Sequence, residues 1–203
     1  MPALETSVLL LAVIVIGGYL IGSIPFGLLV SKLFRLPDPR GYGSKNIGAT
    51  NVLRSGSKIA ALTTVLLDAG KGVAAVLFAN MIAGADGAQV AGLAAFVGHA
   101  YPIWLGFKGG KGVATLFGVI VTMSPLIGFL ALCAWLFTFF VFRYSSLSAL
   151  MAAIVTPPIA MFTGNQDMLA MLIVMAAMLF WTHRANIKRL VEGSEPMVNL
   201  KKK

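Results

Sequence analysis

Long apolar stretches alternate with short polar stretches along the whole chain. A membrane-spanning helix needs about 20 mostly apolar residues, and several of these stretches reach that length. The polar stretches between them are rich in Lys, Arg, Gly and Asn. The pattern predicts an all-α polytopic membrane protein, whose apolar runs cover residues 6–31, 58–84, 88–105, 113–142, 145–162 and 168–181.

The run at residues 113–142 contains no charged residue and is too long for one ordinary helix. Ser124 and Pro125 lie inside it, and proline disfavours a helix interior. We therefore expect two helices here, with a turn near Met123, which gives seven transmembrane helices in total.

Seven spans place every basic loop on one side of the membrane if residues 32–58 are cytoplasmic. The opposite side then holds Glu5, Asp86 and Asp167 and neither Lys nor Arg. We expect an extracytoplasmic N-terminus, a cytoplasmic C-terminus and a single domain over residues 1–203. No basic residue precedes the first run and no polar cleavage region follows it, so we expect this span to be retained rather than cleaved as a signal peptide.

Two spans contain residues that constrain their packing. The first run is rich in glycine, which lets neighbouring helices approach closely, and Pro25 is expected to kink its inner end. Asp68 and Lys71 lie in the second run, three residues apart, so on a helix they share a face and can neutralise each other. An internal ion pair that fixes packing and a direct ligand role are both consistent with this spacing.

Composition agrees with a membrane protein. Hydrophobic residues make up 58% of the chain and charged residues 11%, whereas a soluble domain has about 25% charged residues. The net charge is +9, but the basic residues lie in short gaps between apolar runs. That distribution is typical of membrane topology rather than of nucleic-acid binding. The single Cys133 excludes an intramolecular disulfide.

The first polar loop contains Gly-Tyr-Gly-Ser-Lys-Asn-Ile-Gly-Ala-Thr-Asn at residues 41–51, followed by Arg54. Glycines allow backbone amides to point at an anion, and the planar guanidinium group of arginine suits phosphate. A solvated Gly/Asn loop explains the composition equally well. The hydrogen-bonding candidates are Ser44, Asn46, Thr50 and Asn51.

A second motif runs from Gly-His-Ala-Tyr-Pro at residues 98–102 to Phe-Lys-Gly-Gly-Lys-Gly-Val-Ala-Thr at residues 107–115. Lysines and glycines before a helix start are suited to binding phosphate. A Walker A loop is excluded because position 105 is Leu and a glycine follows Lys111. A positive-inside anchor would explain the lysines but not the glycines. His99 alone is more typical of a hydrogen-bonded structural histidine. The binding candidates are Lys108, Gly109, Gly110, Lys111 and Gly112.

A third motif, His-Arg-Ala-Asn-Ile-Lys-Arg-Leu at residues 183–190, precedes Glu-Gly-Ser-Glu at residues 192–195. On a continuing helix His183 and Asn186 would share one face. A basic helix end at the membrane interface is the alternative.

All three motifs are expected on the cytoplasmic face, which suggests that a phosphorylated, water-soluble substrate meets a lipid-like one. The sequence has no acidic cluster for a metal and no Gly-x-Ser-x-Gly elbow, so we expect no metal or other cofactor. A membrane transporter of a phosphorylated anion is the main alternative, and it should show inverted repeats. A non-catalytic lipid-binding scaffold would not need His183 together with Asn186.

These three motifs, in this order, resemble the bacterial membrane acyl-phosphate:glycerol-3-phosphate acyltransferases. The segments at residues 22–27 and 68–72 also fit, and the resemblance extends from Gly18 to Glu195. One departure is Lys45, where many members of that family have Gly. The resemblance implies seven spans in the bacterial cytoplasmic (inner) membrane, with the active site on the cytoplasmic side.

The reaction implied by the resemblance belongs to phospholipid biosynthesis. Acyl phosphate and glycerol 3-phosphate would give 1-acyl-glycerol 3-phosphate (lysophosphatidic acid) and phosphate. Membrane lipid is the only other partner, with no nucleic acid and no obligate protein partner. By motif match, the catalytic residues would be Ser44, Arg54, His183 and Asn186. The substrate-binding residues would be Asn46, Thr50, Asn51 and Lys108–Gly112, and structural residues near the site would be Asp68, Lys71, His99 and Glu195.

The chemistry requires no covalent enzyme intermediate, because acyl phosphate is a mixed anhydride with phosphate as a good leaving group. We expect direct attack by the primary hydroxyl of a positioned glycerol 3-phosphate. Either His183 or a phosphate oxygen of the donor could accept the proton. The acyl-CoA-dependent signature His-x-x-x-x-Asp is absent, since Trp104 and Lys188 stand where its Asp would be.

Overall fold

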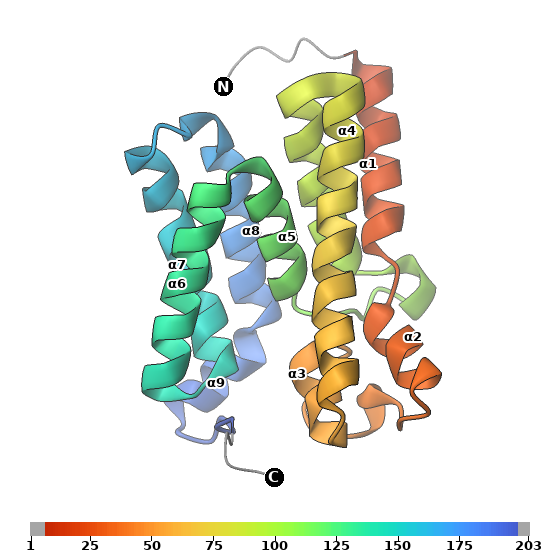
Figure 1. The fold of residues 1–203 in the computed structure, drawn as a ribbon, viewed down its shortest axis with the longest axis vertical. Coiled ribbons are helices and arrows are strands. Elements are labelled where there is room, and N and C mark those ends of the chain that lie inside the picture. The colour runs from red at the N-terminus through yellow and green to blue at the C-terminus, as the bar shows by residue number, and fades with distance from the viewer. Residues whose placement is uncertain (1–6, 199–203) are drawn as a thin grey trace. The chain divides into compact units, whose positions relative to one another are not determined.

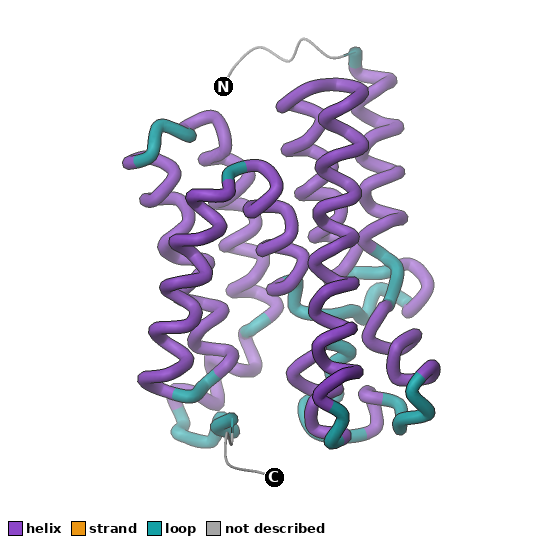
Figure 2. Tube along the Cα trace, viewed as in Figure 1, coloured by secondary structure: helices purple, strands orange, loops and turns teal. Residues whose placement is uncertain are grey.

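The computed structural model describes residues 7–198, and every regular element in that part of the chain is helical (Figures 1 and 2). This confirms the predicted all-α class. The chain divides into two compact units, with the boundary between Met123 and Ser124. A single domain over residues 1–203 stays a prediction.

The α-helices of the first unit are α1 (Val8–Gly22), α2 (Phe26–Leu33), α3 (Ala49–Val52), α4 (Lys58–Ala100) and α5 (Val113–Met123). Those of the second unit are α6 (Pro125–Phe142), α7 (Ser145–Phe162), α8 (Leu169–Thr182) and α9 (Arg184–Val191). Short 3-10 helices occupy Pro39–Gly41, Leu53–Ser55, Ile103–Leu105 and Gln166–Met168.

The first apolar run is broken near its inner end, as Pro25 predicts. Helix α1 ends at Gly22, and α2 begins at Phe26. Pro25 precedes α2 as its N-cap residue, and its carbonyl accepts hydrogen bonds from Leu28 and Leu29. The main chain of Ile24 is therefore left outside both helices.

Helix α4 is a hairpin of two antiparallel arms. Its 43 residues are interrupted at Ala83 and Gly84, and Gly84 has a φ of 59°, a conformation that glycine adopts without steric cost. Beyond this turn Gly92 lies against Val76, and Gly87 against Ala79. Figure 1 shows the two arms joined at one end of the first unit. The first arm corresponds to the predicted span 58–84. The second corresponds to the predicted span 88–105, but it ends earlier, at Ala100.

Small residues allow the helices of the first unit to pack closely. A buried cluster joins α1 to both arms of α4 through Ile14, Ala75, Ala79, Ala91 and Ala95. A Cβ atom at Gly22 would collide with the backbone of Ala95, and one at Gly118 would collide with the backbone of Ala69. Within a membrane the hydrophobic effect does not drive helices together, because lipid tails are as apolar as the side chains. Close backbone contact of this kind is then a main source of helix association.

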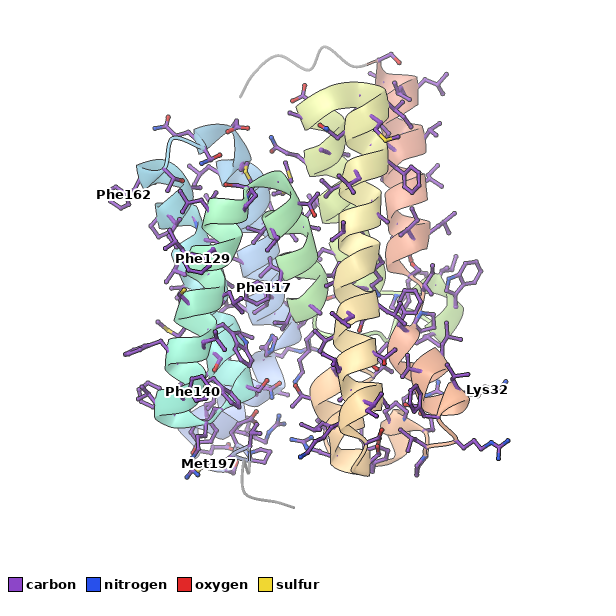
Figure 3. All side chains as sticks on the ribbon, viewed as in Figure 1. Lys32, Phe117, Phe129, Phe140, Phe162 and Met197 are labelled. Atoms are coloured by element: carbon purple, nitrogen blue, oxygen red, sulfur yellow. The ribbon has the colours of Figure 1, made fainter. Side chains whose placement is uncertain are left out.

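The second unit is built from α6, α7 and α8, followed by α9 at an angle of 62° to the helical segment before it. The predicted turn lies at Ser124, and α7 has the predicted bounds of 145–162, running through Pro157 and Pro158. Phe129, Phe140 and Phe162 project outward from this unit (Figure 3), and Phe162 is 90% exposed. Exposed aromatic side chains on apolar helices are suited to contact with lipid.

Length and apolar composition identify the helices that could cross a membrane. Four segments qualify, namely Val8–Leu33, Lys58–Leu105, Pro125–Phe142 and Ser145–Phe162, and the bent pair α8 and α9 makes a fifth. Helix α5 is apolar but shorter, with 11 residues. Several helices therefore have the properties of transmembrane spans.

Two substitutions in α1 test the close packing against α4. Gly22→Ala should lower the free energy of unfolding by about 1–3 kcal/mol, because the added methyl group overlaps the Ala95 backbone. Gly17→Ala is the matched control, since no described atom lies within 4 Å of a Cβ at that position. Thermal unfolding in detergent should show a loss for Gly22→Ala alone; equal effects of the two substitutions would contradict this packing.

Candidate functional site

The first polar loop is organised by the buried side chain of Asn51, which is 1% exposed. Its Oδ1 accepts hydrogen bonds from the Ser44 amide (3.0 Å) and from Arg54 Nη1 (3.2 Å). Its Nδ2 donates to the carbonyl oxygens of Pro39, Tyr42 and Asn46. Both ends of this amide therefore hold the loop together, and a direct contact of Asn51 with substrate stays a prediction.

The Arg54 side chain is oriented within the same loop. It is exposed on the surface of the first unit and lies across Gly43, where a Cβ atom would collide with Asn51 Oδ1. A hollow of ≈ 530 Å³ is lined by Pro37, Asp38, Gly41, Tyr42, Arg54 and Ser55. A guanidinium group held in this way can offer parallel N–H donors to a phosphate.

Ser44 lies between two residues with left-handed backbone, Gly43 (φ 56°) and Lys45 (φ 55°). Lys45 occupies the position where many members of the family that the sequence resembles have glycine. A residue with a Cβ in this conformation costs roughly 1–2 kcal/mol, which gives that preference a physical reason. Ser44 and Thr50 are exposed, while the side chain of Asn46 accepts a hydrogen bond from the Gly48 amide.

Arg40 and Arg54 differ in the side chains that they contact. Arg40 donates to both carboxylate oxygens of Asp38, with Nη2 to Oδ2 at 2.6 Å. The hydrogen bonds from the Arg40 side chain and amide hold the pKa of Asp38 below its usual value. Arg40 is thus already paired with a carboxylate, whereas the contact from Arg54 to Asn51 is with a neutral amide.

The glycines of the second motif have a different role from the one their sequence suggests. The Gly109 amide donates to the carbonyl of Ala100 (3.1 Å), and the Gly110 amide donates to that of His99 (3.0 Å). A Cβ at Gly109 would meet the His99 carbonyl, and one at Gly110 would meet the His99 ring. These two glycines let the loop fold back onto the end of α4, so their amides are not directed at an anion.

The rest of this loop consists of two lysines, Lys108 and Lys111, and of Gly112, which leads into α5. Lys108 is exposed and Lys111 half-buried. Gly112 has a φ of 87° and lies against the ring of Phe96. The lysine side chains are the cationic groups that the loop can offer to a phosphorylated ligand.

The predicted pair of Asp68 and Lys71 forms inside α4. Lys71 Nζ lies 3.0 Å from Asp68 Oδ1, and both side chains are buried. His99, on the other arm of the hairpin, places Nδ1 3.5 Å from the same oxygen. The spacing of the sequence predicted the ion pair but gave no sign that His99 completes it.

In the second unit, His183 lies at a break between helices rather than on a continuing helix. It is the C-cap residue of α8 and is 2% exposed. Its Nδ1 lies 2.9 Å from the carbonyl oxygen of Leu179. A carbonyl only accepts, so Nδ1 carries the hydrogen, and Nε2 of the neutral ring has the lone pair. Nε2 is therefore the basic nitrogen of the ring in this tautomer.

Asn186 is held by Glu195, which accepts hydrogen bonds from three side chains on two helices of the second unit, α7 and α9. Glu195 Oε1 accepts from Asn186 Nδ2 (2.6 Å) and from Ser146 Oγ (2.7 Å), and Oε2 accepts from Arg189 Nε (2.7 Å). Burial opposes the charge of Glu195, but these hydrogen bonds from Ser146, Asn186 and Arg189 outweigh it and lower its pKa. Ser146 was not predicted from the sequence, because a serine at a helix start carries no local sign of a partner 49 residues away.

Several apolar helices are long enough to span a membrane, and the polar segments between them carry lysine and arginine side chains. These features define an α-helical integral membrane protein. No group of three His, Cys, Asp or Glu side chains suited to a metal occurs within residues 7–198. The family model for glycerol-3-phosphate acyltransferase matches residues 12–193. The chain therefore belongs to the glycerol-3-phosphate acyltransferase family.

Relatives and solved structures agree with this assignment. The chain is 50% identical over 203 residues to the glycerol-3-phosphate acyltransferase of Dinoroseobacter shibae, covering all of both chains. It is 48% identical over 198 residues to that of Agrobacterium fabrum, covering 97% of this chain and 96% of the relative. Among solved structures, PlsY, an integral membrane glycerol 3-phosphate acyltransferase, matches in its glycerol 3-phosphate form with a TM-score of 0.88 and 39% identity, over 93% of this chain and 96% of that one. Its lysophosphatidic acid form matches with a TM-score of 0.87 and 38% identity, over 93% and 95% of the two chains.

The lowered pKa of Glu195 predicts a pH dependence of stability. A carboxylate with a depressed folded-state pKa stabilises the fold fully above its ordinary value of 4.5, and this contribution is lost as the pH falls through the folded-state pKa. Thermal unfolding from pH 6 downward should therefore show a decline below pH 4.5 that Glu195→Gln reduces. Glu192→Gln, at an exposed position, is the control and should keep the wild-type profile. Identical profiles for all three proteins would contradict the role of Glu195.

Proposed function

We propose that this chain transfers a fatty acyl group from acyl phosphate to the primary hydroxyl of glycerol 3-phosphate. The products are 1-acyl-glycerol 3-phosphate and inorganic phosphate, and the reaction takes place at the bacterial inner membrane on its cytoplasmic side. The observation that carries the proposal is the match over nearly the whole chain to a structure solved in both its glycerol 3-phosphate and lysophosphatidic acid forms. Those two compounds are the acceptor and the product of the proposed reaction.

The chain's own residues support this chemistry within each unit. In the first unit, Arg54 is oriented by Asn51, and Lys108 lies in the folded-back loop after α4. We assign Arg54, Ser44 and the loop lysines to binding phosphate groups and offsetting their charge. In the second unit, we assign His183 to accepting the hydroxyl proton, as a general base. Asn186, fixed by Glu195, is assigned to orienting a substrate.

The proposed step is a single acyl transfer. The hydroxyl oxygen of glycerol 3-phosphate bonds to the acyl carbon, and the bond from that carbon to the phosphate oxygen breaks. The hydroxyl proton goes to His183 Nε2 or to an oxygen of the departing phosphate. No enzyme nucleophile is needed, because the anhydride already supplies a good leaving group. Precise placement of the two substrates is then the main contribution of the protein.

The function is tested with purified protein, a synthetic long-chain acyl phosphate and glycerol 3-phosphate. Phosphate and lysophosphatidic acid should form in equal amounts, without ATP and with a chelator present. Replacing the donor by acyl-CoA should stop the reaction. Phosphate release without lysophosphatidic acid would contradict acyl transfer, and chelator-sensitive activity of the pure protein would contradict the metal-free mechanism.

We infer seven membrane crossings: α1, the two arms of α4, and one each for α5, α6, α7 and α8. A straight helix of 43 residues would be about 65 Å long, roughly twice the thickness of the hydrocarbon core. The break in α4 and the contacts between its arms therefore support two crossings. Helix α5, about 16 Å long, is the weakest span by length. The sorting of basic residues supports a cytoplasmic C-terminus.

The inferred topology predicts which positions are accessible from each side. In a Cys133→Ser background, single cysteines at Lys32 and Arg143 should react with a membrane-impermeant thiol reagent only after cell permeabilisation. Cysteines at Asp86 and Asp167 should react in intact cells with a permeable outer membrane. Labelling of Asp86 and Lys32 from the same side would contradict seven crossings.

Arg54 tests whether phosphate binding depends on guanidinium geometry or on charge alone. Arg54→Lys should reduce kcat/KM nearly as much as Arg54→Ala, because lysine cannot form two parallel hydrogen bonds. A hydrogen bond to a charged group contributes about 1.5–3 kcal/mol, so we expect a loss of roughly ten- to a hundredfold. Arg40→Lys, in the ion pair with Asp38, is the control and should have little effect. Wild-type kinetics for Arg54→Lys would show that charge alone is sufficient.

A further inference from the structure

Three buried ionisable side chains of the first unit have no part in the proposed chemistry. Asp68, Lys71 and His99 are 3%, 4% and 4% exposed, respectively. We propose that His99, whose ring lies beside the Asp68–Lys71 ion pair, is a positioning residue that sets the conformation of the Lys108–Gly112 loop for binding a phosphorylated substrate. The role rests on the proposed function, because it requires that this loop bind a substrate phosphate.

The ion pair is anchored outside its own helix. Lys71 Nζ, 3.0 Å from Asp68 Oδ1, also donates to the main-chain oxygen of Ile24 at 3.0 Å. Ile24 lies in the break between α1 and α2, so its carbonyl is not part of a helical hydrogen-bond ladder. Thr115 Oγ1, in the first turn of α5, donates to the main-chain oxygen of Asp68 at 2.9 Å. The ion pair thus joins α4 to the broken first span, and the main chain of Asp68 joins α4 to the start of α5.

One edge of the His99 ring faces this ion pair, and the other faces the loop. Nδ1 lies 3.5 Å from Asp68 Oδ1. A Cβ at Gly110 would collide first with Nε2 and then with Cε1 and Cδ2 of the ring. The backbone of Gly110 therefore rests directly on the imidazole. The main chain strengthens this contact, because the Gly110 amide donates to the His99 carbonyl.

These contacts give His99 control over a segment that would otherwise be flexible. Glycine loses more conformational freedom on ordering than any other residue, and the loop contains three glycines within five residues. The ring and the carbonyls at the end of α4 fix the loop before substrate arrives. Without the ring, binding would have to order the loop, so the loss should appear as a higher KM for a phosphorylated substrate.

His99→Asn is the informative substitution. The Asn amide can reach toward Asp68 as Nδ1 does, so the buried carboxylate keeps a partner, but the ring edge that touches Gly110 is gone. KM for the phosphorylated substrate that this loop binds should rise roughly five- to thirtyfold, the effect of ordering about one more backbone residue on binding. Turnover should change less than KM, and thermal stability should stay close to the wild-type value. Each substrate is titrated separately to identify which KM changes.

A double-variant cycle tests the contact itself. Gly110→Ala alone should be strongly destabilising, because its methyl group overlaps the ring. In the His99→Asn background the same substitution should be much less harmful, since the overlapping ring atoms are absent. Gly109→Ala is the matched control: its methyl group would meet the His99 and Ala100 carbonyls and Pro102, so removing the ring should not relieve it.

The outcomes separate the inference from the function on which it rests. Active wild-type protein with both KM values unchanged in His99→Asn would overturn the positioning role and leave the acyltransferase function intact. Additive stability effects of His99→Asn and Gly110→Ala would also overturn it, because they would show no contact between ring and loop. Wild-type protein that forms no lysophosphatidic acid would overturn the proposed function and, with it, the role assigned to His99.

Discussion

The buried ion pair between Asp68 and Lys71 is the interaction on which the first unit depends. Two charges removed from water are costly unless they are paired and further hydrogen-bonded. The two charges are paired, and Lys71 also donates to the Ile24 carbonyl, while His99 Nδ1 lies 3.5 Å from Asp68 Oδ1. The ion pair therefore fixes four segments at one point: the break in the first span, both arms of α4, and the loop that rests on His99. Close glycine contacts elsewhere in the unit allow the helices to come near enough for this arrangement.

In the second unit, a single carboxylate connects side chains from different helices. Glu195 receives hydrogen bonds from Ser146 on α7 and from Asn186 and Arg189 on α9. It thereby ties α9, with the predicted catalytic residue Asn186, to the body of the unit after the 62° bend at His183. In the second unit the carboxylate contacts Asn186, which the proposed chemistry uses directly, whereas in the first unit Asp68 contacts Lys71 and His99. Rigid support of this kind suits a reaction in which placing two substrates accounts for most of the catalysis.

The sequence predicted the helices well, because hydrophobic length and proline position act locally. The turn at Ser124, the bounds of α7 and the Asp68–Lys71 pair were all expected from nearby residues. Contacts between distant segments were not predictable in this way. The glycines at 109 and 110 looked like anion-binding positions, yet their amides bond to the end of α4. The pattern also could not show that the helix breaks at His183 or that Glu195 reaches Ser146, since both depend on tertiary packing.

The central claim is that the buried charges of α4 hold the Lys108–Gly112 loop in place, and hydrogen exchange tests it most directly. Replacing both charges, with Asp68→Asn and Lys71→Met, removes the ion pair without leaving one charge unpaired. The amides of Gly109 and Gly110 should then exchange faster, because the ring and carbonyls of the α4 end lose their fixed position. A peptide covering residues 187–195 should exchange as in the wild type. Unchanged exchange at residues 105–113 in the folded double variant would contradict the claim.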